Sequence, residues 1–148
     1  MKKTGEAWKV LQSNRVSATM GLHSPALVLK YPKGEVVKAI KGTIGIFCFS
    51  DKTSADEFVS TCRIDPTQIV VRCETFGKGR IPPTTIPSIC VVPSPQALKA
   101  AVYFNWLWSR KSISPDEKRA RLKSKYLAPS TWITPRGSVC YPAIRCLE

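Results

Sequence analysis

The first part of the chain contains three short, mainly apolar runs that look like strands. Short runs of this kind cover residues 7–11, 15–20 and 26–31, and we expect them to form an antiparallel opening. The third run ends at Pro32-Lys33-Gly34-Glu35, a sequence typical of a turn. Residues 43–49 are apolar at both parities, which predicts a central strand covered on both faces.

A strand–helix–strand unit is expected next. Ser54-Ala55-Asp56-Glu57 has the spacing of a capping box and predicts a helix with Ser54 as its N-cap. Phe58, Val59 and Cys62 supply the buried face of that helix. Residues 68–76 form an alternating run, which predicts the returning strand.

Residues 77–88 break this regularity. They contain two glycines, three prolines and two cations, so we expect a long loop in place of a helix or a strand. Long loops inside compact domains are often functional. A short apolar strand over residues 89–92 is expected to follow.

Two later helices are marked by Ser-Pro pairs. Ser94-Pro95 and Ser114-Pro115 each place an N-cap serine before proline at the first helical position. Large apolar side chains surround the end of the first helix over residues 103–108, and we expect a neighbouring element, a second subunit or a ligand to cover them. The second helix is basic, and a solvated face is the simplest interpretation. The segment 131–147 predicts a turn, a last strand and a docked C-terminus.

These elements predict one α+β domain over residues 1–148, with a single antiparallel or mixed sheet and about three helices. A chain of 148 residues suits one core, which would bury roughly 70% of the unfolded surface. No apolar run is long enough to span a bilayer, and no apolar signal core follows the first residues. We therefore expect a cytoplasmic protein without a membrane partner.

The six cysteines include no CxxC pair, and the single histidine, His23, has no neighbouring ligand residue. We expect no metal site and no cofactor. Cys48, Cys73 and Cys90 lie in apolar strand-like runs and are expected to be buried thiols. The even number of cysteines also permits disulfides, which a reducing cytosol disfavours.

The usual signatures of catalysis are absent from the sequence. There is no HExxH motif, no GxSxG motif and no Walker loop, so we expect a protein that is not an enzyme. A cysteine hydrolase that uses His23 is the catalytic alternative.

The net charge of +13 predicts an anionic partner. Lys78 and Arg80 flank glycines in the expected loop, and Arg136-Gly137-Ser138 combines a guanidinium group, a backbone amide and a hydroxyl group. Such groups bind phosphate oxygens.

Flat aromatic rings accompany these phosphate-binding groups and are suited to stacking on a base, although rings on a helix are commonly core. They are Phe104, Trp106, Trp108 and Trp132. A nucleic-acid binder with the basic helix 118–125 is the alternative interpretation, although no RNP, KH or zinc-finger pattern is present.

Several short motifs point to one family. They are Leu27–Tyr31 followed by Gly34-Glu35, Gly42–Phe49 leading into Ala55–Phe58, and Thr134–Val139. In these motifs and in the order of its elements, the chain resembles the phage Thoeris anti-defence sponge family. The resemblance implies a protein that sequesters cyclic ADP-ribose signals of TIR-domain immune enzymes without cleaving them. It also implies a dimer-based homo-oligomer in the cytoplasm of the infected host cell, with pockets at subunit contacts. The loop 81–87 and the helix 116–125 have no counterpart in the family.

The expected ligand is a cyclic ADP-ribose-type molecule or another cyclic nucleotide, including a cyclic oligonucleotide. Phe104 or Trp108 is expected to stack on its base, Asn105 to bond its base or ribose, and Arg136 with Arg145 to bind its phosphates. The full set of expected site residues is Phe104, Asn105, Trp108, Arg136, Gly137, Ser138 and Arg145.

Overall fold

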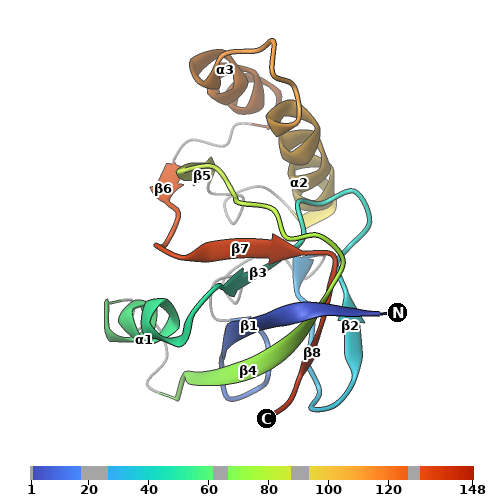
Figure 1. Cartoon of the computed structure of the whole chain (residues 1–148). Coiled ribbons are helices and arrows are strands. Elements are labelled where there is room, and N and C mark those ends of the chain that lie inside the picture. The colour runs from blue at the N-terminus through green and yellow to red at the C-terminus, as the bar shows by residue number, and fades with distance from the viewer. Residues whose placement is uncertain (1, 18–26, 62–66, 88–93, 127–130) are drawn as a thin grey trace.

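The computed structural model describes residues 2–17, 27–61, 67–87, 94–126 and 131–148. These residues form one antiparallel sheet of six strands, a small two-stranded sheet and three helices (Figure 1). The α+β class predicted from the sequence is confirmed. None of the helices in this part of the chain has the length and apolar character needed to cross a bilayer.

The central strand of the large sheet comes from the start of the chain. The elements are β1 Lys3–Leu11, β2 Val36–Lys38, β3 Ile46–Phe49, α1 Lys52–Thr61, β4 Ile69–Phe76, β5 Thr85–Pro87, α2 Ser94–Trp108, α3 Pro115–Tyr126, β6 Thr131–Ile133, β7 Ser138–Tyr141 and β8 Ala143–Cys146. The order in the large sheet is β2-β8-β4-β1-β3-β7, and β5 pairs with β6. Because β1 pairs with β4 along nearly its whole length and with β3 on its other edge, it holds the two halves of the sheet together.

The sheet is strongly curled. β7 and β8 are separated in the chain only by Pro142, although three strands lie between them in the sheet. In a flat sheet those two strands would be about 19 Å apart, far more than one residue spans. The sheet therefore bends until the end of β7 meets the start of β8 (Figure 1). The bend brings the segment before β3 close to this turn, and Ala39 N donates to Pro142 O at 2.8 Å.

Three apolar clusters fill the molecule. One lies on the concave face of the sheet and contains Ala7, Leu11, Tyr31, Ile46, Cys48, Val71, Cys73, Ile144 and Cys146. A second lies on the opposite face under α1 and contains Val10, Phe49, Ala55 and Phe58. The third joins α2 and α3 to the sheet through residues that include Leu107, Leu122 and Cys140.

The expected helix starts are partly confirmed. The α3 cap is confirmed, because Glu117 N donates to Ser114 Oγ at 3.2 Å. The prediction of Ser54 as the N-cap of α1 was wrong. Asp51 caps that helix, since Ser54 N donates to Asp51 Oδ1 at 2.7 Å. An aspartate side chain accepts the same bond as a serine, and here it stands three residues earlier than expected.

Several predicted strands are shorter in the structure or absent from it. The runs 15–20 and 26–31 contribute only isolated bridges, which join Ser17 to Leu11 and Val16 to Lys30, and residues 18–26 lie outside the described part. The expected central strand 43–49 begins only at Ile46. The loop 77–88 contains β5, while the expected strand 89–92 lies outside the described residues.

A lysine is buried on the concave face of the sheet. Lys9 on β1 is 1% exposed, and its Nζ donates to Ser17 Oγ at 2.8 Å and to Phe47 O at 2.5 Å. The same atom lies 5.1 Å from the centre of the Tyr31 ring. No ion pair among the described residues involves Lys9, and burial lowers its pKa. The bonds of Lys9 therefore tie β1 to β3 and to the segment around Ser17.

Replacing Lys9 with Met should remove a pH-dependent cost of folding. The folded state has the lower pKa, so the unfolded chain binds the proton more strongly and stability rises with pH toward the ordinary value of 10.5. The free energy of unfolding of the wild type minus that of Lys9→Met should therefore increase with pH, by at most about 1.4 kcal/mol per pH unit. Urea unfolding of both proteins over a pH series measures this difference. The contributions of the other titrating groups cancel in it, because both proteins contain them. A difference that is constant with pH would contradict the expectation.

Candidate functional site

The seven residues expected to bind a ligand lie in three separate places. Phe104, Asn105 and Trp108 are on α2, and Arg145 is on β8. Arg136 and Gly137 lie in the turn before β7, and Ser138 is the first residue of β7. No hydrogen bond, ion pair or ring contact of the described residues joins these places. The structure therefore does not assemble the expected residues into one pocket.

The two rings expected to stack on a base are part of the α2–α3 core. Phe104 is 5% exposed, and its ring centre lies 5.5 Å from that of Trp108. Lys118 of α3 covers Trp108, with its Nζ 4.8 Å from the ring centre. The neighbouring helix α3 thus covers part of the apolar end of α2, which is one of the three possibilities left open by the sequence, while Trp106 remains 42% exposed. The side chain of Trp132 lies outside the described part of the chain.

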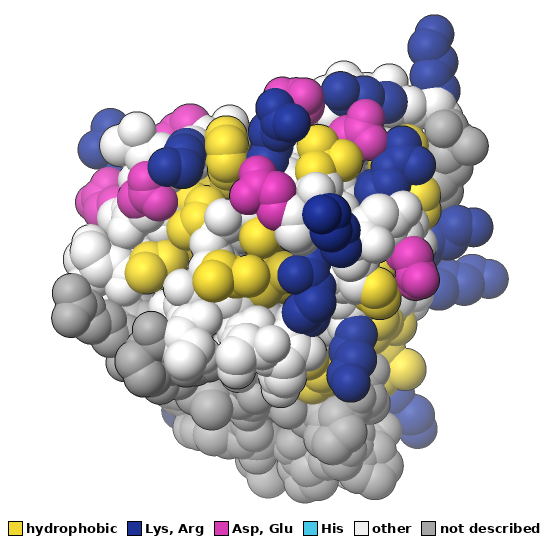
Figure 2. Space-filling model, turned by 90° about the horizontal axis from the view of Figure 1, so that it is seen from below, with side chains coloured by type: hydrophobic (Ala, Val, Ile, Leu, Met, Phe, Trp, Pro, Cys, Tyr) yellow, Lys and Arg dark blue, Asp and Glu magenta, His cyan; other side chains and the backbone are white. Residues whose placement is uncertain are grey.

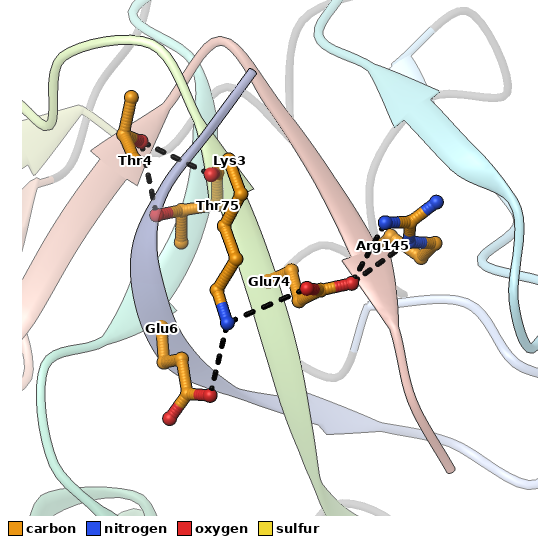
Figure 3. A network of polar contacts seen from close by, with 6 residues as sticks. All are labelled: Lys3, Thr4, Glu6, Glu74, Thr75 and Arg145. Atoms are coloured by element: carbon orange, nitrogen blue, oxygen red, sulfur yellow. Dashed lines mark hydrogen bonds and ion pairs between the residues drawn. The ribbon is translucent and has the colours of Figure 1, made fainter. Parts of the chain in front are cut away.

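Arg145 forms an ion pair within the sheet. Its Nε and Nη2 donate to Glu74 Oε1 at 2.9 and 2.8 Å, and Lys3 Nζ lies 3.4 Å from Glu74 Oε2 (Figure 3). The hydrogen bond from Arg145 is the main reason why the pKa of Glu74 is lowered. A phosphate at Arg145 would have to bind the remaining donors of the guanidinium group or displace this carboxylate.

The turn that contains Arg136, Gly137 and Ser138 supports the start of α1. Ser50 N donates to Gly137 O at 2.8 Å, and Ser138 Oγ donates to Pro135 O at 2.6 Å. The pKa of Asp51 is lowered chiefly by the backbone hydrogen bond from Ser54, and the charge of Arg136 adds to this effect. These contacts give the turn a structural role at the cap of the helix.

A basic recess lies where the curled sheet meets α2. Its volume is about 240 Å³, and it opens between the segments 39–45 and 78–80. The lining residues are Ala39, Ile40, Lys41, Gly42, Thr43, Ile44, Gly45, Lys78, Arg80, Cys140 and Pro142. Three of these side chains are cationic and none is acidic, so the recess is suited to an anion. We refer to it as the basic recess.

Arg80 is held in the basic recess by its backbone and by its side chain. Its backbone exchanges two 2.8 Å hydrogen bonds with Cys140 of β7. Its Nη1 donates to Asn105 Oδ1 at 2.8 Å, and Asn105 Nδ2 donates to Gly42 O at the same distance. Asn105 is the one expected site residue that borders the recess, and it positions Arg80 there.

Glycines allow the segment 40–45 to form one wall of the recess. Gly45 has a φ of +122°, and a Cβ at this position would lie 2.9 Å from Tyr141 O. Gly42 has a φ of +85°, and its Cβ would lie 3.2 Å from Val102 of α2. Larger residues would push this wall away from β7 and α2.

An open groove adjoins the basic recess. It has a volume of about 430 Å³ and is lined by Thr4, Gly5, Thr75, Gly77, Lys78, Gly79 and Tyr141. Lys78 lines both hollows. The half-buried ring of Tyr141, whose pKa is raised by burial, is the aromatic group of this groove.

The face of the molecule seen from below carries mixed charge, because basic side chains there are interspersed with acidic and apolar ones (Figure 2). The charges there partly cancel, in contrast to those of the basic recess.

The sequence indicated only part of this site. Lys78 and Arg80 were expected to bind phosphate, and both line the recess. Lys41 and the glycines Gly42 and Gly45 were missed, because the residues from 43 onward were assigned to a strand. The signal was the run Lys41-Gly42-Thr43-Ile44-Gly45, which combines a cation with glycines as the segment 77–80 does.

No family model, curated protein or solved structure matches this chain. In the residues that the structure covers, no three His, Cys, Asp or Glu side chains are grouped so that they could hold a metal ion. The function of the protein is therefore inferred from its structure alone, an α+β fold with a basic recess where the curled sheet meets α2.

Gly45→Ala should unfold the recess wall, whereas Gly34→Ala serves as a matched control. Both glycines have positive φ, but a Cβ at Gly34 meets no atom within 4 Å. We expect the control to lose about 1 to 2 kcal/mol of unfolding free energy from backbone strain alone. Gly45→Ala adds a clash with the backbone of β7 and should lose about 3 kcal/mol or more. Equal losses in urea unfolding would contradict this account of the wall.

Proposed function

We propose that the protein binds a phosphate-bearing nucleotide in the basic recess and sequesters it without catalysing a reaction. The observation that carries the proposal is the group of three cations, Lys41, Lys78 and Arg80, with no acidic side chain beside them. In agreement with the resemblance of the sequence to Thoeris anti-defence sponges, the proposed ligand is a cyclic ADP-ribose-type signal of a TIR-type host defence.

Uncompensated charge is the first argument for a phosphate ligand. Five described cations, Lys3, Lys52, Arg119, Arg121 and Arg145, each form an ion pair with an acid, whereas others outside the recess, such as Lys33 and Lys38, do not. The three cations of the recess form none with any described acidic residue. Their mutual repulsion disfavours the folded state, and a bound anion would relieve it.

The donor geometry is the second argument. Arg80 uses one of its five N–H donors to bond Asn105, and this bond fixes the direction of the guanidinium plane. The other donors can bind a phosphate in a bidentate manner, while Lys41 and Lys78 act as point charges. Such a set fits a pyrophosphate group better than a single carboxylate.

The adjoining groove supplies room for the rest of a nucleotide. Its volume of about 430 Å³ lies in the range of small-molecule sites. Tyr141 offers an aromatic surface for a base there, in place of Phe104 and Trp108, which were expected from the sequence.

The chemistry of the lining supports binding without turnover. The recess has no lining His, Asp, Glu or Ser, and its only thiol is Cys140. Burial raises the pKa of Cys140 to about 12, so this group remains a protonated, weakly nucleophilic thiol at neutral pH.

A dimer-based homo-oligomer in the host cytoplasm is part of the same proposal. Val102 and Trp106 lie one helical turn apart on α2 and are both exposed, Trp106 by 42%. They provide apolar surface for a second copy of the chain next to Asn105, at the rim of the basic recess.

The proposal predicts that the protein withholds a cyclic ADP-ribose isomer and releases it unchanged on heating. Arg80→Ala and the double variant Lys41→Ala/Lys78→Ala should each weaken binding by about tenfold or more, because each lost charge-assisted bond is worth about 1.5 to 3 kcal/mol. Equilibrium dialysis before heating and chromatography after heating provide the two readouts.

Lys33→Ala is the matched control, because Lys33 is an exposed turn residue that lines neither hollow. Its affinity should equal that of the wild type. A degraded ligand would contradict sequestration, and equal affinity in all variants would contradict the basic recess as the site.

Nucleic-acid binding by the α2–α3 arm, residues 94–126, is a second candidate function. The arm carries eight Lys or Arg and two Asp or Glu, and Figure 1 shows α3 far from the sheet. Arg110 lies 4.7 Å from the ring centre of the exposed Trp106, a combination that suits an unpaired base beside a phosphate.

Binding of single-stranded RNA by this arm should depend strongly on salt. Each phosphate contact contributes about −0.7 to the slope of log affinity against log salt. Arg110→Ala/Lys111→Ala should therefore make the slope shallower by about 1.4. A slope near zero for the wild type would exclude this second function.

A further inference from the structure

Two thiols face each other across β4 and β8. Cys73 and Cys146 are register partners in this antiparallel pair, and their Sγ atoms are 3.2 Å apart. The preceding position is hydrogen-bonded, because Leu147 N donates to Arg72 O at 2.9 Å. Cys73 and Cys146 therefore occupy a non-hydrogen-bonded position, where opposing Cα atoms are only about 4.5 Å apart and the side chains are closest.

We propose that Cys73 and Cys146 form a redox pair, which closes to a disulfide when the protein meets a small-molecule disulfide such as oxidised glutathione. The Cα spacing of such a position falls within the range that disulfides use. The two sulfur atoms need to approach by only about 1.2 Å to reach the bonding distance of about 2.0 Å.

The reaction balances as two successive thiol–disulfide exchanges. In the first, the Cys146 thiolate attacks one sulfur of oxidised glutathione, which forms a mixed disulfide and releases one glutathione thiolate. In the second, Cys73 loses its proton and attacks the Cys146 sulfur, which releases the second glutathione. Two electrons pass from the pair to the oxidant, and the two thiol protons end on the released glutathiones.

The contact between the thiols assigns their roles. Cys73 Sγ donates to Cys146 Sγ, and this hydrogen bond lowers the pKa of Cys146 while it raises the pKa of Cys73. The interaction with the buried Lys9 also lowers the pKa of Cys146. Cys146 is therefore the attacking thiol and Cys73 the resolving one.

The other described cysteines are less suited to oxidation. Burial raises the pKa of Cys48 and of Cys140 to about 12 in each case. Only the pair on β4 and β8 has its two sulfur atoms in direct contact among the described residues.

Both thiols are buried, so the reaction requires β8 to open. The end of this strand is held by a few backbone bonds, among them Gly34 N to Cys146 O at 2.8 Å. Local opening of such a strand costs less than global unfolding and gives the oxidant access. Once formed, the disulfide would fix β8 covalently to β4.

The test equilibrates the full chain with a mixture of oxidised and reduced glutathione. Remaining thiols are then alkylated in denaturant, and trypsin releases Cys73 in peptide 73–78 and Cys146 in peptide 146–148. We expect these two peptides to be recovered joined by a disulfide that reductant cleaves. The proposal would be overturned if both peptides were recovered alkylated or singly glutathionylated. It would also be overturned if Cys73 were recovered joined to another cysteine.

Matched variants separate this pair from the other thiols. Cys48→Ser and Cys140→Ser should keep the linked peptides.

In the wild type, oxidation should raise the urea midpoint of unfolding, because the cross-link restricts the unfolded chain, and reductant should reverse the rise. Cys73→Ala should show no such rise. An oxidised wild type whose midpoint does not rise would contradict a disulfide formed in the native geometry.

Discussion

The pairing of the central strand β1 with β4 and with β3 is the constraint on which the rest of the structure depends. The buried side chain of Lys9 adds to this pairing, because a polar group removed from water is costly unless its hydrogen bonds are replaced, and Lys9 Nζ donates to Phe47 O on β3 and to Ser17 Oγ. These bonds hold the central strand β1 in one position against β3. The register of β1 with β3 and with β4 then determines how the sheet curls and which side chains meet on its concave face.

Local patterns in the sequence were sufficient for the fold class and for some of the site. N-cap serines at Ser94 and Ser114 predicted two helices, because capping depends on neighbours a few residues away. Lys78 and Arg80 were recognised from glycines beside them. The ion pair of Arg145 could not be predicted, since its partner Glu74 is 71 residues away in the chain and meets it only through the pairing of β4 with β8. The aromatic end of α2 was ambiguous for the same reason, because only the packing of α3 made it core.

The basic recess and the thiol pair are both products of the curled sheet. The recess joins the segments 39–45 and 78–80 to Pro142, which are distant in sequence and meet where β7 turns into β8. Cys146 is the last residue of β8, at the end of that strand away from Pro142, and Cys73 lies opposite it on β4. A disulfide there would fix the end of β8 to β4. The phosphate-binding function and the redox pair are separate proposals, because no residue of β8 lines the recess.

A titration with inorganic pyrophosphate, followed through the backbone amide signals of the protein in NMR spectra, tests the central claim most directly. The account predicts saturable shifts centred on Gly42, Gly45, Lys78 and Arg80, which surround the basic recess. Shifts confined to the turn at Gly137, or no saturable shift at all, would contradict it.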